Sequence, residues 1–193
     1  MTQPARYIVD GVPFISVTEV LREAGLVDFS MVPAGLLEAA RIRGTRVHRL
    51  TELIDRGDTQ LDVDDDMLGY VDAYERFRKE VPFEIQLIEK EVWSKHYRYA
   101  GRVDRVGLLN GHPSILDYKT GLTVEWWEGL QLAGYEVCLA NYPTVIKPDV
   151  RHRRYALHLR PDGTYKLVRF ESRSDRPDFL AAVRIANLRR RHA

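Results

Sequence analysis

Two carboxylates and one ammonium group give this sequence its clearest chemical signal. Asp104 lies in the segment Gly-Arg-Val-Asp-Arg-Val, and Asp117 follows thirteen residues later in Asp-Tyr-Lys, which also contains Lys119. Alternate residues of a β-strand point to the same face, so Asp117 and Lys119 are expected to share one surface. A turn at Asn110-Gly111 would pair the two strands and bring Asp104 within reach of Asp117.

This pair of carboxylates predicts a metal site. Neighbouring carboxylates repel each other unless a positive charge lies between them. Mg²⁺ is the natural candidate, because it prefers oxygen ligands and keeps water molecules that leave room for a substrate phosphate. Lys119 would orient the attacking water and stabilise the charge that develops in the transition state. The chemistry predicted is phosphodiester hydrolysis, and the structural alternative is a cross-strand ion pair at a sheet edge.

Polar pairs on two predicted helices add to this pattern. His48 and Glu52 lie four residues apart in the helix expected over residues 34–56, so they share one face. A histidine aimed at the carboxylates would add a nitrogen ligand, which suits Mn²⁺ better than Mg²⁺. Gln131 and Tyr135 have the same spacing on the helix after the Asp-x-Lys strand, where they would position a nucleic-acid backbone or form an ordinary surface pair.

The order of these residues resembles the RecB-type branch of the PD-(D/E)XK nuclease superfamily: a helical histidine, Gly-Arg-Val-Asp, Asp-x-Lys, then Gln-x-x-x-Tyr. The resemblance implies that His48, Asp104 and Asp117 ligate the metal, together with the backbone carbonyl of Tyr118. It also implies that Lys119 is the catalytic lysine. The fold implied is a restriction-endonuclease-like α/β core, in which a central mixed β-sheet is flanked by helices. The iron–sulfur cysteines of some members are missing, so no iron–sulfur cluster is expected.

Two charged residues are assigned supporting roles beside Asp104. The superfamily often has an acidic residue on the strand before this aspartate, and Glu91 is our candidate, although Glu89 shares its strand parity. Arg102 shares strand parity with Asp104 and would neutralise a phosphate beside the metal. A surface salt bridge is the alternative for this arginine.

Further DNA contacts are expected from the helix that follows the Asp-x-Lys strand. The resemblance, which covers roughly residues 44 to 135, implies that Gln131 and Tyr135 contact DNA or brace the site. Trp126 and Trp127 point about 100 degrees apart on a helix, so one of them is expected in the core. We assign the exposed role to Trp126, whose indole would stack on an unpaired base.

The charge is unevenly distributed along the chain. The net charge is only +1, but residues 151–193 contain 12 Lys and Arg against 4 Asp and Glu, whereas the first 150 residues contain 17 against 24. This division predicts polyanion binding by the basic C-terminal region, with a solvated helix face as the alternative. Four arginines there are spaced to give a basic face for a DNA strand, namely Arg184, Arg189, Arg190 and Arg191; for the last four residues, 190–193, a disordered basic tail is the alternative.

Hydrophobic periodicity and turn signals predict a mixed α/β chain. A hairpin around Asp10-Gly11 leads into a helix that begins at Ser16 with the spacing of a capping box. An apolar stripe from Leu36 to Ile54 predicts that the helix over 34–56 is amphipathic along its length. The other predicted elements are a helix near 67–80, strands over 84–93, 97–108 and 113–118, a helix from Trp126 to Ala140, strands near 152–159 and 164–170, and a helix over about 177–191.

The length and composition limit the functions open to this chain. Its 193 residues suit one nuclease domain over 1–193, and the 45% hydrophobic content is enough for a sizeable core. Cys138 stands alone, which excludes internal disulfides and thiolate zinc sites and predicts a small buried side chain. No apolar run approaches the roughly 20 residues that span a bilayer, so no membrane partner is expected. Cytoplasmic residence in a bacterial or phage-infected cell is the expectation.

The first functional hypothesis is a Mg²⁺-dependent exonuclease, with Mn²⁺ as the alternative ion, that trims DNA ends in recombination, repair or phage replication. Its partners would be DNA and recombination or replication proteins. The second hypothesis is a structure- or sequence-specific endonuclease. The third is a catalytically inactive nucleic-acid-binding module that keeps the fold as a scaffold.

Overall fold

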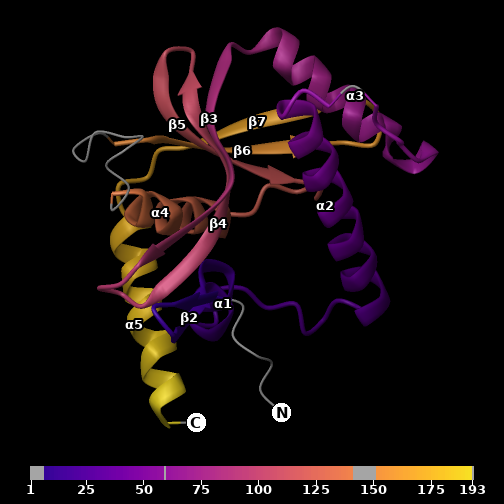
Figure 1. The fold of residues 1–193 in the computed structure, drawn as a ribbon. Coiled ribbons are helices and arrows are strands. Elements are labelled where there is room, and N and C mark those ends of the chain that lie inside the picture. The colour runs from indigo at the N-terminus through magenta and orange to yellow at the C-terminus, as the bar shows by residue number, and fades with distance from the viewer. Residues whose placement is uncertain (1–6, 59, 141–150, 193) are drawn as a thin grey trace.

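Five helices flank a seven-stranded mixed β-sheet (Figure 1), as the sequence predicts. The computed structural model describes residues 7–58, 60–140 and 151–192, and the architecture is that of these residues. The strands are β1 (Tyr7–Val9), β2 (Val12–Ser16), β3 (Phe83–Ser94), β4 (Tyr99–Leu109), β5 (His112–Lys119), β6 (Arg153–Leu159) and β7 (Tyr165–Phe170). The helices are α1 (Val17–Glu23), α2 (Ala34–Asp55), α3 (Asp65–Glu80), α4 (Trp127–Leu139) and α5 (Asp175–His192).

Local turn chemistry accounts for the early elements and for the central hairpin. Asp10 and Gly11 both have positive φ, as do Asn110 and Gly111, which is the backbone of a two-residue hairpin turn. The Ser16 hydroxyl accepts from the Glu19 amide while the Glu19 carboxylate accepts from the Ser16 amide, so the predicted capping box is present. The predicted hairpins and the predicted start of α1 are therefore confirmed.

The helices divide between the two faces of the sheet, each with its own core. Helices α1, α4 and α5 cover one face, where their apolar side chains pack with those of β4 around fully buried residues such as Leu132 and Phe179. Helices α2 and α3 cover the other face, where Tyr74 and Phe77 pack against β5 and β6. Cys138 is buried in the first core, as predicted.

The first half of α2 departs from the predicted amphipathic packing. Its buried residues are Val47, Leu50 and Thr51, all in the second half. Leu36 is 64% exposed and neither Leu37 nor Ala40 is buried, so the apolar stripe predicted from Leu36 onward does not face a core there. Figure 1 shows the reason, because the N-terminal half of α2 extends past the sheet.

Strand β4 changes partners along one edge, and this change creates a fork in the sheet. Residues 99–100 pair in parallel with β2, whereas residues 105–109 pair antiparallel with β5. Strand β3 occupies the opposite edge of β4 from end to end. On the divided edge, the described ladders leave residues 101–104 between the two partners, and Asp104 lies in this interval.

The described helices contain no segment both long enough and apolar enough to cross a membrane.

Candidate active site

The fork between β4 and β5 places the two predicted aspartates next to each other. The ladder ends with Arg105 opposite Leu116, and the next step of that register puts Asp104 opposite Asp117. There the strands separate, and the Asp104 carboxylate accepts a hydrogen bond from the Tyr118 amide with an N···O distance of 2.6 Å. A side chain thus replaces the missing backbone partner, as a buried amide requires.

A group of possible metal ligands forms around Asp104. His48, from the well-packed half of α2, places Nδ1 3.3 Å from the Asp104 carboxylate and 3.4 Å from that of Glu89 on β3. One ligand atom from each of the three residues lies within 4.8 Å of the others. The other ring nitrogen of His48, Nε2, lies 3.3 Å from the backbone carbonyl of Tyr118. Of the four predicted metal ligands, His48 and Asp104 therefore lie in this group, and the Tyr118 carbonyl lies at the other nitrogen of the His48 ring.

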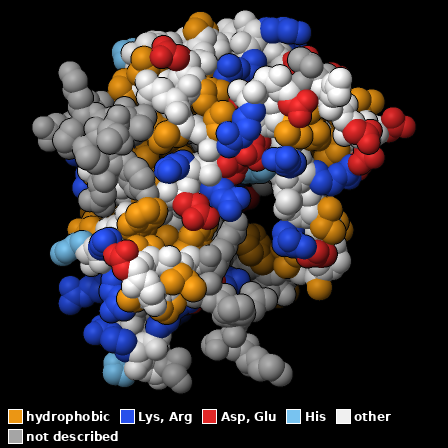
Figure 2. All heavy atoms as spheres, viewed as in Figure 1, with side chains coloured by type: hydrophobic (Ala, Val, Ile, Leu, Met, Phe, Trp, Pro, Cys, Tyr) orange, Lys and Arg blue, Asp and Glu red, His pale blue; other side chains and the backbone are white. Residues whose placement is uncertain are grey.

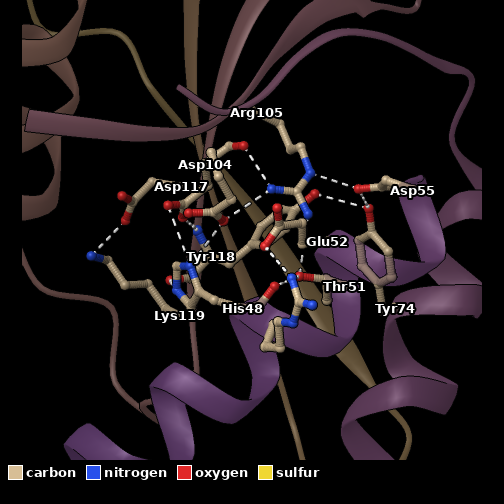
Figure 3. Close-up of polar contacts among 12 residues, drawn as sticks. His48, Thr51, Glu52, Asp55, Tyr74, Asp104, Arg105, Asp117, Tyr118 and Lys119 are labelled. Atoms are coloured by element: carbon tan, nitrogen blue, oxygen red, sulfur yellow. Dashed lines mark hydrogen bonds and ion pairs between the residues drawn. The ribbon is translucent and has the colours of Figure 1, made fainter. Parts of the chain in front are cut away.

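Asp117, the fourth predicted ligand, faces Lys119. Its carboxylate lies 2.5 Å from the Lys119 ammonium, and both side chains are largely buried. The same ammonium donates a hydrogen bond to the Gln131 side-chain oxygen at 2.7 Å and lies 5.4 Å from the centre of the Trp127 ring. Lys119 is thus held from β5 and α4 at once, as Figure 3 shows for its contact with Asp117.

Gln131 and Tyr135 form a brace beneath this lysine. The Gln131 side-chain amide donates to the Tyr135 hydroxyl at 3.1 Å, and both residues are buried. The Tyr135 ring in turn packs against Gly101, where a Cβ atom would lie only 2.6 Å from a ring carbon. Of the two roles expected for this pair, DNA contact or support, the buried geometry favours support.

Burial and mutual charge set the ionisation of the cluster. Burial opposes ionisation of Asp104, but the charge and hydrogen bond of His48, the Tyr118 amide and the charge on Lys119 together outweigh it and hold the pKa of Asp104 below its usual value. Burial raises the pKa of Asp117 to about 6, and the charge on Asp104 acts in the same direction, although Lys119 opposes both. Burial disfavours the charged forms of His48 and Lys119, yet the neighbouring carboxylates outweigh it and raise the pKa of both.

A buried arginine supports the ligand group from behind. Arg105 has no exposed side-chain surface and donates to the Asp55 carboxylate at 2.6 Å and to the Glu89 carboxylate at 3.0 Å. Its guanidinium also lies 4.9 Å from the centre of the Tyr118 ring, within cation–π range. The Tyr74 hydroxyl completes the arrangement by donating to Asp55 (Figure 3). Arg105 therefore fixes Glu89 in position and offsets its charge.

A second buried pair, on the other side of Lys119, was not predicted from the sequence. His158 on β6 is the register partner of Lys119. Its Nε2 lies 3.0 Å from the Glu128 carboxylate in the first turn of α4, and its Nδ1 lies 3.0 Å from the Gly121 carbonyl. This pair ties the loop after Lys119 to the start of the helix that carries Gln131.

The acidic residue of β3 in the site is Glu89, whereas the sequence interpretation favours Glu91. Counting back from the Ser94–Tyr99 pair places Glu91 opposite Arg102, and the next same-face position places Glu89 opposite Asp104. Glu89 also has a φ of 47°, in the left-handed region. The register of this hairpin is the signal that could have separated the two glutamates.

Arg102 and Trp126, the two remaining predicted DNA contacts, lie at the surface. Arg102 pairs with Glu91 across the strands at 3.5 Å, which is the surface salt bridge considered as its alternative. Trp126 is 61% exposed, and Trp127 is the partly buried member of the pair, as the helix geometry predicts. Figure 2 shows a hollow beside α2, with Asp, Glu, Lys and Arg side chains around its rim.

The donor set fits a hard divalent cation. Asp104 and Glu89 offer carboxylate oxygens and His48 offers its Nδ1 nitrogen, while the Tyr118 carbonyl oxygen lies nearby at Nε2 of the same ring. Mg²⁺ and Mn²⁺ take oxygen ligands of this kind, and the imidazole favours Mn²⁺. Neither a family model nor a curated protein matches this chain.

Proposed function

We propose that this chain is a metal-dependent deoxyribonuclease of the RecB-type PD-(D/E)XK kind, acting as an exonuclease on DNA ends. The observation that carries the proposal is a buried Lys119–Asp117 ion pair directly beside the His48–Glu89–Asp104 ligand group. A buried ammonium next to a possible cation site is costly as mere scaffolding, because desolvation of charges opposes it. It is useful where negative charge accumulates during phosphoryl transfer.

In the proposed mechanism His48, Asp104 and Asp117 would hold Mg²⁺ or Mn²⁺ together with the Tyr118 carbonyl, and Glu89 would add a further carboxylate. The bound ion would supply Lewis-acid activation of the phosphate and of a water molecule. Lys119 keeps its proton, donates to the attacking water or to a phosphate oxygen, and so orients it.

Two hydrogen bonds keep Lys119 and Asp104 in place. Gln131 fixes the ammonium by accepting from it. The Tyr118 amide keeps the Asp104 carboxylate turned into the fork.

Removing the lysine ammonium tests this mechanism most directly. We expect Lys119→Ala to reduce cleavage about 10²- to 10⁴-fold, the range for a positioned catalytic group, while DNA binding in the absence of metal persists. Lys95→Ala is the matched control, because Lys95 is exposed and pairs with Asp10 at the hairpin end of β3. Undiminished cleavage by the Lys119 variant would refute the mechanism.

The substrate form separates an exonuclease from an endonuclease. A time course measures the reaction class and the metal requirement together. Its substrates are end-labelled linear duplex, linear single strand, and closed circular DNA in single-stranded and double-stranded form, each with EDTA, Mg²⁺ or Mn²⁺. An exonuclease degrades linear DNA and leaves both closed circles intact, whereas an endonuclease opens the circles. Binding without nucleotide release under any of the metal conditions would identify an inactive DNA-binding module and overturn the proposal.

A further inference from the structure

A groove of about 850 Å³ lies away from the site, between α5 and the turn that joins β3 to β4. Apolar side chains from three elements line part of it, namely Pro13 and Ile15 on β2, Tyr97 in the turn, and Leu180 and Val183 on α5. Arg98, Arg184 and Arg191 also line the groove. It therefore combines an apolar surface with guanidinium groups from two sides.

The charge of this groove has a single sign. Within the described part of the chain, no aspartate or glutamate lines it. Arg190 also lines the groove and pairs with Glu23 at 2.8 Å, but no described carboxylate pairs with Arg98, Arg184 or Arg191. Figure 2 shows Lys and Arg side chains gathered over α5, at the lower left of the view. A cluster of uncompensated cations of this kind attracts an anionic ligand.

The arginines on α5 follow the axis of the groove. Arg184 and Arg191 are seven residues apart, which places them on one face of the helix about 10 Å from each other. A nucleic-acid strand presents several phosphates over such a length. The rings of His96 and Tyr97, whose centroids are 4.5 Å apart, stand beside these cations in the turn. Aromatic rings next to a cationic track are the features by which proteins hold single strands.

We propose that this groove binds a single-stranded segment of nucleic acid, with phosphates on the three arginines and a base or sugar against Tyr97. Arg98 is the turn residue just before β4 and precedes Asp104 by six residues, so the groove begins about 20 Å from the fork along an extended strand. A DNA strand that enters the active site thus has a second place of attachment on the same protein. For the identity of the ligand, this inference rests on the proposed function.

An acidic peptide cannot bind in the groove by adding a strand to β2. Strand addition, one common mode of peptide binding, needs an open sheet edge. Strand β2, which contributes Pro13 and Ile15, is paired with β1 on one side and with β4 on the other. Pro13 in addition has no amide hydrogen to donate.

The salt dependence of binding tests the proposal without any need for cleavage. Affinity for a labelled single-stranded oligonucleotide is measured by fluorescence anisotropy in EDTA, for the wild type and for the triple variant Arg98→Ala, Arg184→Ala, Arg191→Ala. Each lost phosphate contact lowers the slope of log K against log salt by about 0.7, so the triple variant should lose about 2. Between about 50 and 200 mM salt, the wild type should therefore lose about twentyfold more affinity than the variant does.

A matched control separates a local contact from total charge. The triple variant Arg76→Ala, Lys79→Ala, Arg169→Ala removes the same charge from α3 and β7, where each residue pairs with a nearby glutamate. We expect its slope to equal that of the wild type. Circular dichroism and thermal melts confirm folding, and the single variants Arg98→Ala and Arg184→Ala replace the triple variant if it is unstable.

Equal slopes for the wild type and the groove variant would overturn the inference. Binding of a polyglutamate peptide to the wild type alone, with DNA binding unchanged between the two proteins, would overturn it in favour of an acidic peptide. The outcome is independent of the proposed nuclease activity. If the protein never cleaves DNA but the groove variant has a reduced salt slope, the inference about the groove still stands. If the protein cleaves DNA and the two slopes are equal, only the inference about the groove is refuted.

Discussion

Replacing Arg105 by methionine tests whether the buried guanidinium holds the candidate site together. The side chain has no exposed surface, and the carboxylates of Asp55 and Glu89 both lie within 3.0 Å of it. Methionine keeps an unbranched apolar stem but leaves both acids without this cation. Removing one partner of a buried ion pair costs about 3–5 kcal/mol, because the remaining charge stays desolvated. This loss is a large fraction of a typical unfolding free energy of about 5–15 kcal/mol.

Urea unfolding at pH 7, followed by circular dichroism and tryptophan fluorescence, measures this loss directly. Arg76→Met is the matched control, because Arg76 makes an exposed i, i+4 pair with Glu80 and its loss should cost about 0.5 kcal/mol or less. The double variant Arg105→Met, Asp55→Leu should recover part of the stability, since it removes a stranded charge. A loss below about 1 kcal/mol for Arg105→Met would refute the view that this arginine neutralises the acids around the site.

Three further predictions concern residues around the site and in the sheet. His158→Ala frees the loop after Lys119 from Glu128, so steady-state kinetics should show a lower kcat with little change in metal-free DNA binding, and His158→Gln should restore part of it. Gly101→Ala forces a Cβ into the Tyr135 ring, and urea unfolding should show a loss of about 1–3 kcal/mol. Burial lowers the pKa of His152 to about 4, below its unfolded value near 6.5. The folded state therefore holds His152 neutral, which costs no stability above about pH 6.5 and costs progressively more as the pH falls toward about 4, because the unfolded chain takes up the proton first. Between pH 7 and about pH 4.5, urea unfolding should show a loss of stability about 2–3 kcal/mol smaller for His152→Gln than for the wild type.

The sequence predicts the elements and the centre of the site because the relevant signals are local. The Asn110-Gly111 turn sets the register that brings Asp104 opposite Asp117, and strand alternation then places Lys119 beside Asp117. The Ser16 capping box and the positive-φ turns likewise depend on neighbouring residues alone. Such features can be counted along the chain without knowledge of the tertiary fold.

The remaining parts of the site depend on contacts that are distant in sequence. Glu89 could be told from Glu91 only by the register of a hairpin whose turn lacks a two-residue glycine signal. Arginine is usually found at the surface, so the sequence gives no sign that Arg105 is buried. Its burial depends on partners that are distant in sequence, such as Asp55. His158 meets Lys119 through a parallel pairing of β5 with β6, which no short turn announces.

The two halves of α2 should differ in hydrogen exchange. Amides before Arg46 belong to a segment without buried side chains, so they are expected to open by local fraying and to exchange rapidly. From Val47 onward the helix is anchored in a core, and protection should rise within one turn. His48 lies just past this boundary. The N-terminal half of α2 can therefore open locally, while the His48 imidazole stays fixed against the sheet.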